Sequence, residues 1–206
     1  MAYLRKRKST PYAFAHKGAQ PAGLQNQINR LKTEVGKNKP ETKFFRFSAT
    51  IDSVTNGNEL STINVTQALI NSTSFRDNIN GEQWTNKALN VNVIAQPDCT
   101  NLRVIVYVPK KVGEHFSPSL ASGTCYTRFP DPNKYWVLSD KLMTSQTTDV
   151  ITPLKMRCNL RGLKTILDSN ATAIERSEIK IAFFTNGINA LAPQLSYSAE
   201  LVYNDN

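Results

Sequence analysis

The residues of this chain best suited to ionic chemistry are cations that crowd near its amino terminus. Residues 5–8 read RKRK, and no acidic residue precedes Glu34. Residues 1–43 carry ten Lys or Arg and two acids, a net charge of +8, whereas the remaining fifteen cations and fourteen acids leave +1. A cationic arm joined to a nearly neutral body is typical of segments that neutralise the phosphates of nucleic acid.

Two groups of cations are candidate phosphate contacts. The first lies in the arm. The second lies in the body, where Arg157 and Arg161 alternate with apolar neighbours and so project from one face of a strand. Arg46 and Arg103 are placed in the same way in their own strands, which predicts a second, weaker phosphate-contact surface. The candidate nucleic-acid-binding residues are therefore Arg5, Lys6, Arg7, Lys8, Lys17, Arg30, Lys32, Arg157 and Arg161.

The run Arg5–Lys8 has a second interpretation, because short segments rich in Lys and Arg also act as nuclear import signals. Tyr3, Tyr12 and Phe14 lie among these cations, where aromatic rings can stack on unpaired bases. The segment is poor in large apolar residues, so it cannot offset the entropy of its own ordering. We expect residues 1–22 to be disordered until nucleic acid binds.

Residues for catalysis or metal binding are scarce. The chain has two histidines, His16 and His115, and no nucleophile elbow, P-loop, GxGxxG or HExxH motif accompanies them. Its three cysteines are widely spaced, which indicates neither a disulfide framework nor a zinc site. We expect no catalytic residue, no metal site and no cofactor. No signal peptide or apolar run of membrane-spanning length is visible, so we also expect no membrane insertion.

A short helix is predicted within the arm, which we define as residues 1–42. Its evidence is an apolar stripe over residues 23–35, formed by Leu24, Ile28, Leu31 and Val35. A glycine then supplies a stop signal. Such a helix either frays in solution or docks on the body or on a neighbouring subunit, and the sequence does not choose between these.

The body, residues 43–206, alternates apolar and polar residues with the period of two that β-strands have. About eight such segments are separated by turns rich in Asn, Gly, Pro and Ser, which predicts an all-β sandwich or barrel. The segments are 43–54, 60–71, 88–95, 102–109, 134–143, 154–167, 178–185 and 195–203, of which 60–71 fits a short strand followed by a turn. Gly162 is expected to mark a bulge, and the long connection 110–133 to form a contact surface.

Six short motifs follow one another along the body: FRFSATIDSV, TSFRDNINGEQWTNKALNVNVIA, NLRVIVYVPKK, KYWVLSDKLM, EIKIAFFTNG and PQLSYSAELVYND. Their order resembles that of capsid proteins from small circular single-stranded DNA viruses that encode their own replication initiator, the relatives of the circoviruses. The most specific motif is YWVLSDK, which is similar to the F-x-V-L-x-D-K strand of those capsids. The resemblance covers residues 43–206, whereas the arm adds its charge but little alignable sequence.

The resemblance implies a single jelly roll of about eight antiparallel strands, a β-sandwich. It also implies a capsid protein that assembles with itself into a small icosahedral shell and packages a single-stranded DNA genome through its arm. The protein would then belong to the virion and, during assembly, to the host nucleus. In a shell of roughly 60 copies, residues 1–43 with their net charge of +8 would supply about 480 positive charges to the enclosed phosphates.

Other classes of protein share parts of this pattern. Coat proteins of small RNA or satellite viruses contain similar strings, so RNA remains open as the packaged nucleic acid. A non-viral nucleic-acid-binding β-domain would share the arm but would form no closed particle. A carbohydrate-binding jelly roll would use polar and aromatic residues such as Trp84, Tyr126 and Trp136, although Trp136 lies among apolar residues and is expected in the core.

Overall fold

The computed structural model describes residues 23–34, 40–51, 59–72, 79, 81–95, 101–116, 129–144, 153–170, 172–185 and 195–205. The chain divides into two compact units, Met1–Pro40 and Glu41–Asn206. In the first unit, residues 23–34 form an α-helix. Residues 1–22, for which disorder is predicted, and Val35 lie outside the described residues.

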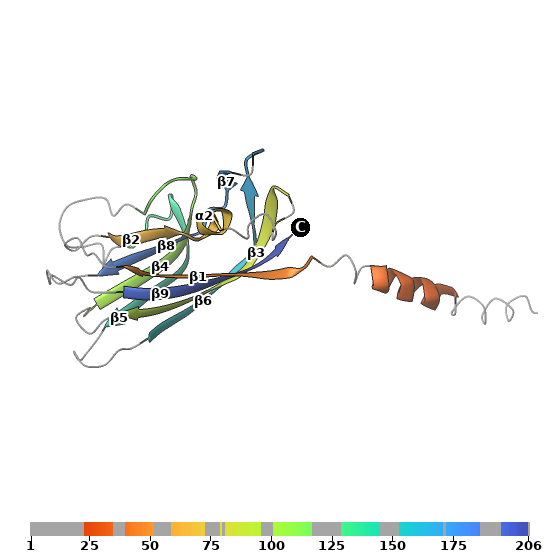
Figure 1. Ribbon diagram of the computed structural model, residues 1–206, viewed down its shortest axis with the longest axis horizontal. Coiled ribbons are helices and arrows are strands. Elements are labelled where there is room, and N and C mark those ends of the chain that lie inside the picture. The colour runs from red at the N-terminus through yellow and green to blue at the C-terminus, as the bar shows by residue number, and fades with distance from the viewer. Residues whose placement is uncertain are drawn as a thin grey trace, which may run out of the picture. The chain divides into compact units, whose positions relative to one another are not determined.

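Nine strands and one short helix make up the described part of the second unit (Figure 1). In chain order they are β1 (Thr42–Ile51), β2 (Glu59–Asn64), α2 (Val65–Ile70), β3 (Gln83–Ala95), β4 (Asn101–Pro109), β5 (Tyr135–Thr144), β6 (Pro153–Leu167), β7 (Ile174–Arg176), β8 (Lys180–Thr185) and β9 (Leu195–Asp205).

The strands form two antiparallel sheets. The order is β1-β9-β3-β6-β7 in the five-stranded sheet and β2-β8-β4-β5 in the four-stranded sheet. Apart from β4–β5 and β6–β7, strands that pair are not consecutive in the sequence, so the chain crosses repeatedly between the sheets. With β7 set aside, this is the eight-strand order of two Greek keys that defines a jelly roll. The prediction of an all-β antiparallel jelly-roll sandwich is confirmed.

The strand β7 is the one that sequence periodicity did not predict. It has three residues, too few for a period of two to be recognised. A loop centred on Asp168 returns the chain onto β6, because Oδ1 of that residue accepts hydrogen bonds from the backbone N–H groups of Thr172 (2.7 Å) and Ala173 (2.9 Å). The Asp168 carboxylate has its pKa lowered chiefly by these two bonds.

The helix α2 replaces the turn expected after β2. Asn64 caps its first turn, since its side-chain Oδ1 accepts a 2.9 Å hydrogen bond from the backbone N–H of Gln67. Val65, Thr66 and Leu69 are buried. A helix of six residues is too short to show a helical stripe, and two of its first residues are β-branched, so the segment resembles a strand in the sequence.

The main core fills the space between the two sheets. The inward positions of β3 (Leu89, Val91 and Val93) face the main core that also contains Val104 and Val106 of β4, and all five are fully buried. The alternation predicted for these strands therefore identifies the inward face. The opposite face of the five-stranded sheet, which we call the outer face, carries the polar residues of the alternation.

A second apolar cluster covers the other side of the four-stranded sheet. It contains Ile105 and Tyr107 of β4, Phe184 of β8 and, from the start of the long connection, Phe116. Tyr107 Oη accepts a 3.0 Å hydrogen bond from the Phe116 backbone N–H. Residues 110–116, which we call the strap, therefore lie against this sheet. The prediction that 110–133 forms a contact surface is untested for residues 117–128, which lie outside the described part of the chain.

A buried ion pair holds the strap down. Lys180 Nζ lies 3.1 Å from Glu178 Oε2, and the two side chains are 2% and 7% exposed. Lys180 Nζ also donates to the backbone oxygen of Glu114 at 3.1 Å, and Glu178 Oε2 accepts a 2.8 Å hydrogen bond from the Gly113 backbone N–H. The other carboxylate oxygen of Glu178 accepts from the Asn64 side chain. One network thus joins the strap, the cap of α2 and β8.

Candidate nucleic-acid interface

The predicted arm contacts fall into two groups. Arg5–Lys8 and Lys17 lie outside the described residues. Arg30 and Lys32 are exposed on the helix of residues 23–34, and Arg30 Nε lies 3.4 Å from Glu34 Oε1 four residues later. Exposed pairs of this kind contribute little and are screened by salt, so the Arg30 guanidinium is available to phosphate.

The apolar stripe of this helix is exposed within its own unit. Leu24, Ile28 and Leu31 are each between 42% and 58% accessible. The unit by itself therefore provides no apolar partner for the stripe among its described residues.

The predicted body contacts lie on β6. Arg157 and Arg161 are both exposed, and the buried residues Met156, Cys158 and Leu160 alternate with them. The bulge expected at Gly162 is confirmed, because the β3–β6 register shifts opposite it and both Arg161 and Gly162 have positive φ (50° and 75°). Arg157 therefore follows the regular outer face, whereas Arg161 sits at the bulge.

Arg103 does not belong to this surface. It was grouped with Arg157 as an exposed strand cation, but it is 6% exposed and lies in β4 of the other sheet. Its Nε donates to Asp140 Oδ1 at 2.8 Å, and its second guanidinium nitrogen reaches Oδ2. This two-pronged ion pair satisfies the cation in place. Sequence alternation shows that a residue points away from the core, but not what covers it there.

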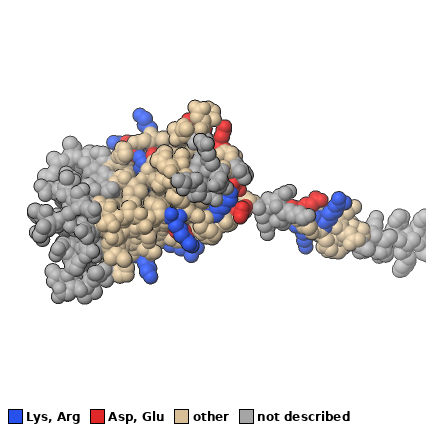
Figure 2. Space-filling view, viewed as in Figure 1, with Lys and Arg blue, Asp and Glu red and all other residues tan. Residues whose placement is uncertain are grey.

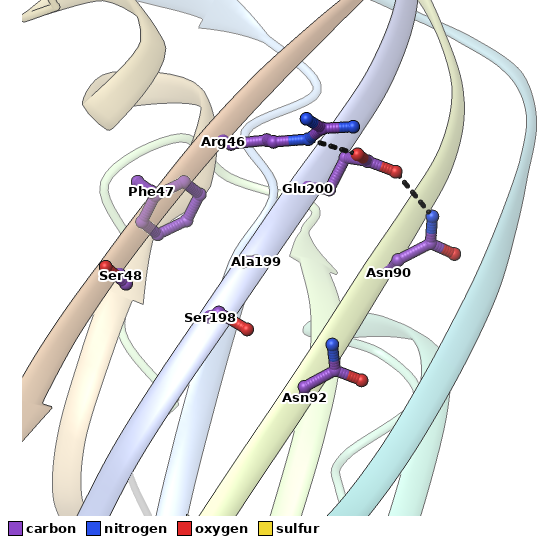
Figure 3. Close-up of a pocket in the computed structure, with 8 residues that line it drawn as sticks. All are labelled: Arg46, Phe47, Ser48, Asn90, Asn92, Ser198, Ala199 and Glu200. Atoms are coloured by element: carbon purple, nitrogen blue, oxygen red, sulfur yellow. Dashed lines mark hydrogen bonds and ion pairs between the residues drawn. The ribbon is translucent and has the colours of Figure 1, made fainter.

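A row of charged and amide side chains crosses the outer face of the five-stranded sheet. The register places Arg46 of β1 opposite Glu200 of β9, Glu200 opposite Asn90 of β3, and Asn90 opposite Arg157 of β6. Arg46 Nε donates to Glu200 Oε2 at 2.6 Å, and Asn90 Nδ2 donates to Oε1 at 3.0 Å (Figure 3). These bonds, that of Arg46 first, lower the pKa of Glu200 and keep it ionised.

A second row runs beside the first, one pleat along each strand. Ser48 faces Ser198, Ser198 faces Asn92, and Asn92 faces Lys155. Because serine side chains are short, a groove of about 450 Å³ opens over them. Figure 3 shows Ser48, Ser198 and Asn92 on one side and the Arg46–Glu200–Asn90 chain of hydrogen bonds on the other. The groove was not predicted, because its residues come from three strands distant in the sequence.

The charge of this region is positive but not concentrated. Arg46, Lys155, Arg157 and Arg161 outnumber Glu200 on the described outer face of β1, β9, β3 and β6. On the face seen in Figure 2, the Lys and Arg side chains of the body form small separate groups. The +8 of the first 43 residues therefore remains the main concentration of charge in the chain.

Chemistry other than binding finds few residues in the described chain. No group of three or more His, Cys, Asp or Glu there could hold a metal ion. Burial raises the pKa of the Cys158 thiol, which favours the unreactive protonated form. No helix among the described residues is both long and apolar enough to cross a membrane.

The burial of the two tryptophans is the reverse of what the sequence predicted. Trp84, named as a possible sugar platform, is fully buried, and its Nε1 donates a 2.8 Å hydrogen bond to Asn86 Oδ1. Trp136, expected in the core, is 54% exposed on the edge strand β5, with Lys110 Nζ 5.8 Å from its ring centre. Trp84 is therefore not available to a sugar, and it was one of the three aromatic residues named for the carbohydrate-binding alternative.

Strand order and pairing define the described body as a jelly-roll β-sandwich. No family model and no curated protein matches the chain. Among solved structures it is similar to one titled Desmodium yellow mottle tymovirus, at 12% identity and a TM-score of 0.44, over 82% of this chain and 89% of that one.

Two further solved structures are similar to a comparable degree. The Triatoma virus empty capsid shares 10% identity over 81% of this chain and 88% of that one, with a TM-score of 0.41. Sacbrood virus of honeybee, in an expansion state, shares 10% identity over 81% and 87% of the two chains, also with a TM-score of 0.41. Likeness at this level carries no residue's role and no activity to this chain.

Proposed function

We propose that this chain is a viral capsid protein that assembles with itself into a closed icosahedral shell around single-stranded nucleic acid. The proposal rests on one observation, that a jelly-roll body and a strongly cationic segment occur in the same chain. A jelly-roll strand order, an architecture that viral capsids use, follows directly on an arm, residues 1–42, that holds +7 of the net charge of +9. An enzyme or sugar-binding jelly roll has no need of such a segment.

The two parts of the chain divide the work in this proposal. The arm, residues 1–42, neutralises phosphates without reading sequence, because contacts to phosphate carry no sequence information. Its contact residues are Arg5, Lys6, Arg7, Lys8, Lys17, Arg30 and Lys32. The body, residues 43–206, builds the shell and adds Arg157 and Arg161 as weaker contacts.

Assembly requires surfaces that copies of the chain can bury against each other. The edge strand β5 offers apolar candidates, since Trp136, Val137 and Leu142 are all at least 40% exposed. Closed symmetry then limits the number of copies, and a shell of roughly 60 is the simplest icosahedral case.

DNA is the nucleic acid that the sequence resemblance favours, and it accounts for a nuclear role of the run Arg5–Lys8. The arm itself suits DNA and RNA equally, because both present the same phosphates. A coat protein of a small RNA virus is therefore the alternative within the same class.

Electron microscopy of the purified protein after nuclease treatment tests the proposal. We expect uniform closed particles, an absorbance ratio at 260 and 280 nm that reveals protected nucleic acid, and DNA on sequencing of the contents. Protected RNA would replace the DNA part of the proposal by its alternative. Small discrete oligomers across a range of salt concentrations would refute the capsid and favour a non-viral nucleic-acid-binding domain.

A further inference from the structure

The groove on the outer face contains polar groups that the fold leaves unused. Among the described residues, the hydroxyls of Ser48 and Ser198 and the amide of Asn92 form no hydrogen bond with another protein group. By contrast, the neighbouring Glu200 accepts hydrogen bonds from two side chains. Donors and acceptors are thus presented side by side, held in register by three paired strands.

The residue types in the groove are unusual for their position. Asn90 and Asn92 lie in β3, the middle strand of the five-stranded sheet, and asparagine is among the residues depleted in strands. Residues whose type does not suit their secondary structure, and which no packing contact explains, are expected at functional sites. Asn92 is exposed, and its side chain forms no hydrogen bond with a described residue, so hydrogen bonding within the fold does not explain its presence.

The size and the chemistry of the groove both point to a small polar ligand. Its volume of about 450 Å³ lies within the usual range of small-molecule sites. Asparagine amides and serine hydroxyls both donate and accept, which matches the mixed edges of a nucleobase, and a carboxylate such as Glu200 accepts from N–H groups on bases, the ring N3–H of thymine among them. At one end of the two rows, Lys155 and Arg157 supply the cations that a phosphate requires.

We propose that this groove binds an unpaired base of single-stranded nucleic acid, with the adjoining phosphates on Lys155 and Arg157. The proposal deepens the proposed function and rests on it. It assigns to the body a contact with bases, in addition to the phosphate contacts that the proposed function gives to the arm. A single strand is required, because in a duplex the bases are stacked and their Watson–Crick edges are paired with each other.

The test compares two short strands of equal length on the full chain, oligothymidylate and its abasic sugar-phosphate analogue. Binding is measured by fluorescence anisotropy at a salt concentration that keeps the protein unassembled. The arm's phosphate contacts contribute equally to both strands and cancel in the ratio of the two affinities. Ser198→Leu fills the groove, and Ser196→Leu is its matched control, on the same strand and sheet face but outside the groove.

We expect the natural chain and Ser196→Leu to prefer oligothymidylate by about tenfold, the effect of one or two net hydrogen bonds. Ser198→Leu should lose that preference and keep its affinity for the abasic strand. Asn92→Asp, which replaces an exposed amide donor by an acceptor, should also lose the preference for oligothymidylate. This variant provides a second test in case Ser198→Leu does not fold. Circular dichroism establishes that each variant is folded.

Two results would overturn the proposal in different ways. An unchanged preference in both Ser198→Leu and Asn92→Asp, or no preference in the natural chain, would refute base binding in the groove and leave packaging by the arm intact. Failure of the natural chain to bind either strand would refute the proposed function, and the groove proposal with it.

Discussion

Replacing Lys180 by methionine removes the cation of the buried pair beneath the strap while keeping a side chain of similar length. The Glu178 carboxylate, 7% exposed, then loses its partner at 3.1 Å. Breaking a buried pair by removing one partner costs about 3–5 kcal/mol. Because Gly113 and Asn64 still donate hydrogen bonds to Glu178, we expect the lower end, about 3 kcal/mol.

The assay is unfolding in guanidinium, followed by tryptophan fluorescence on unassembled protein, with calorimetry beside it. For a folded unit of this size, each kcal/mol lowers the melting temperature by about 2–4 °C. The expected decrease is therefore roughly 6–12 °C. Adding Glu178→Gln removes the orphaned charge, and the double variant should recover about 1–2 kcal/mol.

Lys134→Met is the matched control. Lys134 also faces an acid at the strap, since its Nζ lies 3.9 Å from Glu114 Oε1, but its side chain is 53% exposed. Exposed pairs contribute about 0–1 kcal/mol, so this variant should unfold close to the natural chain. The account of the strap would be refuted if Lys180→Met cost no more than Lys134→Met.

Three further predictions concern charge. Replacing residues 5–8 by alanine should reduce the slope of log affinity for single-stranded DNA against log salt by about 3, at roughly 0.7 per lost phosphate contact, and an unchanged slope would remove these residues from the interface. Carbon-detected NMR titration should place the pKa of Glu200 below that of an ordinary glutamate, and this pKa should rise in Arg46→Ala. Because the pKa is lowered in the folded chain, the stabilisation from Glu200 is present at neutral pH and disappears as the pH falls through the lowered pKa. Burial raises the pKa of Tyr203 to about 12, so its contribution to stability should be lost as the pH rises from about 10 toward that value, and Tyr203→Phe should flatten the alkaline decline seen by circular dichroism.

The parts of the fold that the sequence predicted are those whose side chains repeat with one period over many residues. In β3, Leu89, Val91 and Val93 alternate with asparagines, and the inward face followed correctly. β7 and α2 were missed because three and six residues are too few to establish a period. Each depends on the hydrogen bonds of one side chain to nearby backbone groups: Asp168 for the loop before β7, and Asn64 for the first turn of α2.

The candidate site was harder to predict than the fold. The charge of the arm is a sum over the sequence and needs no structure. The groove depends on register between strands that lie 110 to 154 residues apart, as the hydrogen bonds of Glu200 with Asn90 and Arg46 show. Asparagine in a central strand was the one available signal, and it becomes informative only when β3 is known to be central.

The pairing of β1 with β9 has a consequence for synthesis of the chain. Among the described strands β1 has no other partner, and its first residue, Thr42, bonds to Asn204, 162 positions later. At ordinary rates of translation, the interval between the synthesis of β1 and that of β9 is roughly 10–30 s. During that interval Phe45 and Phe47 have no sheet to cover them, and the cations that precede them in the chain oppose aggregation by mutual repulsion. The arm would thus protect the unfinished protein before it meets any nucleic acid.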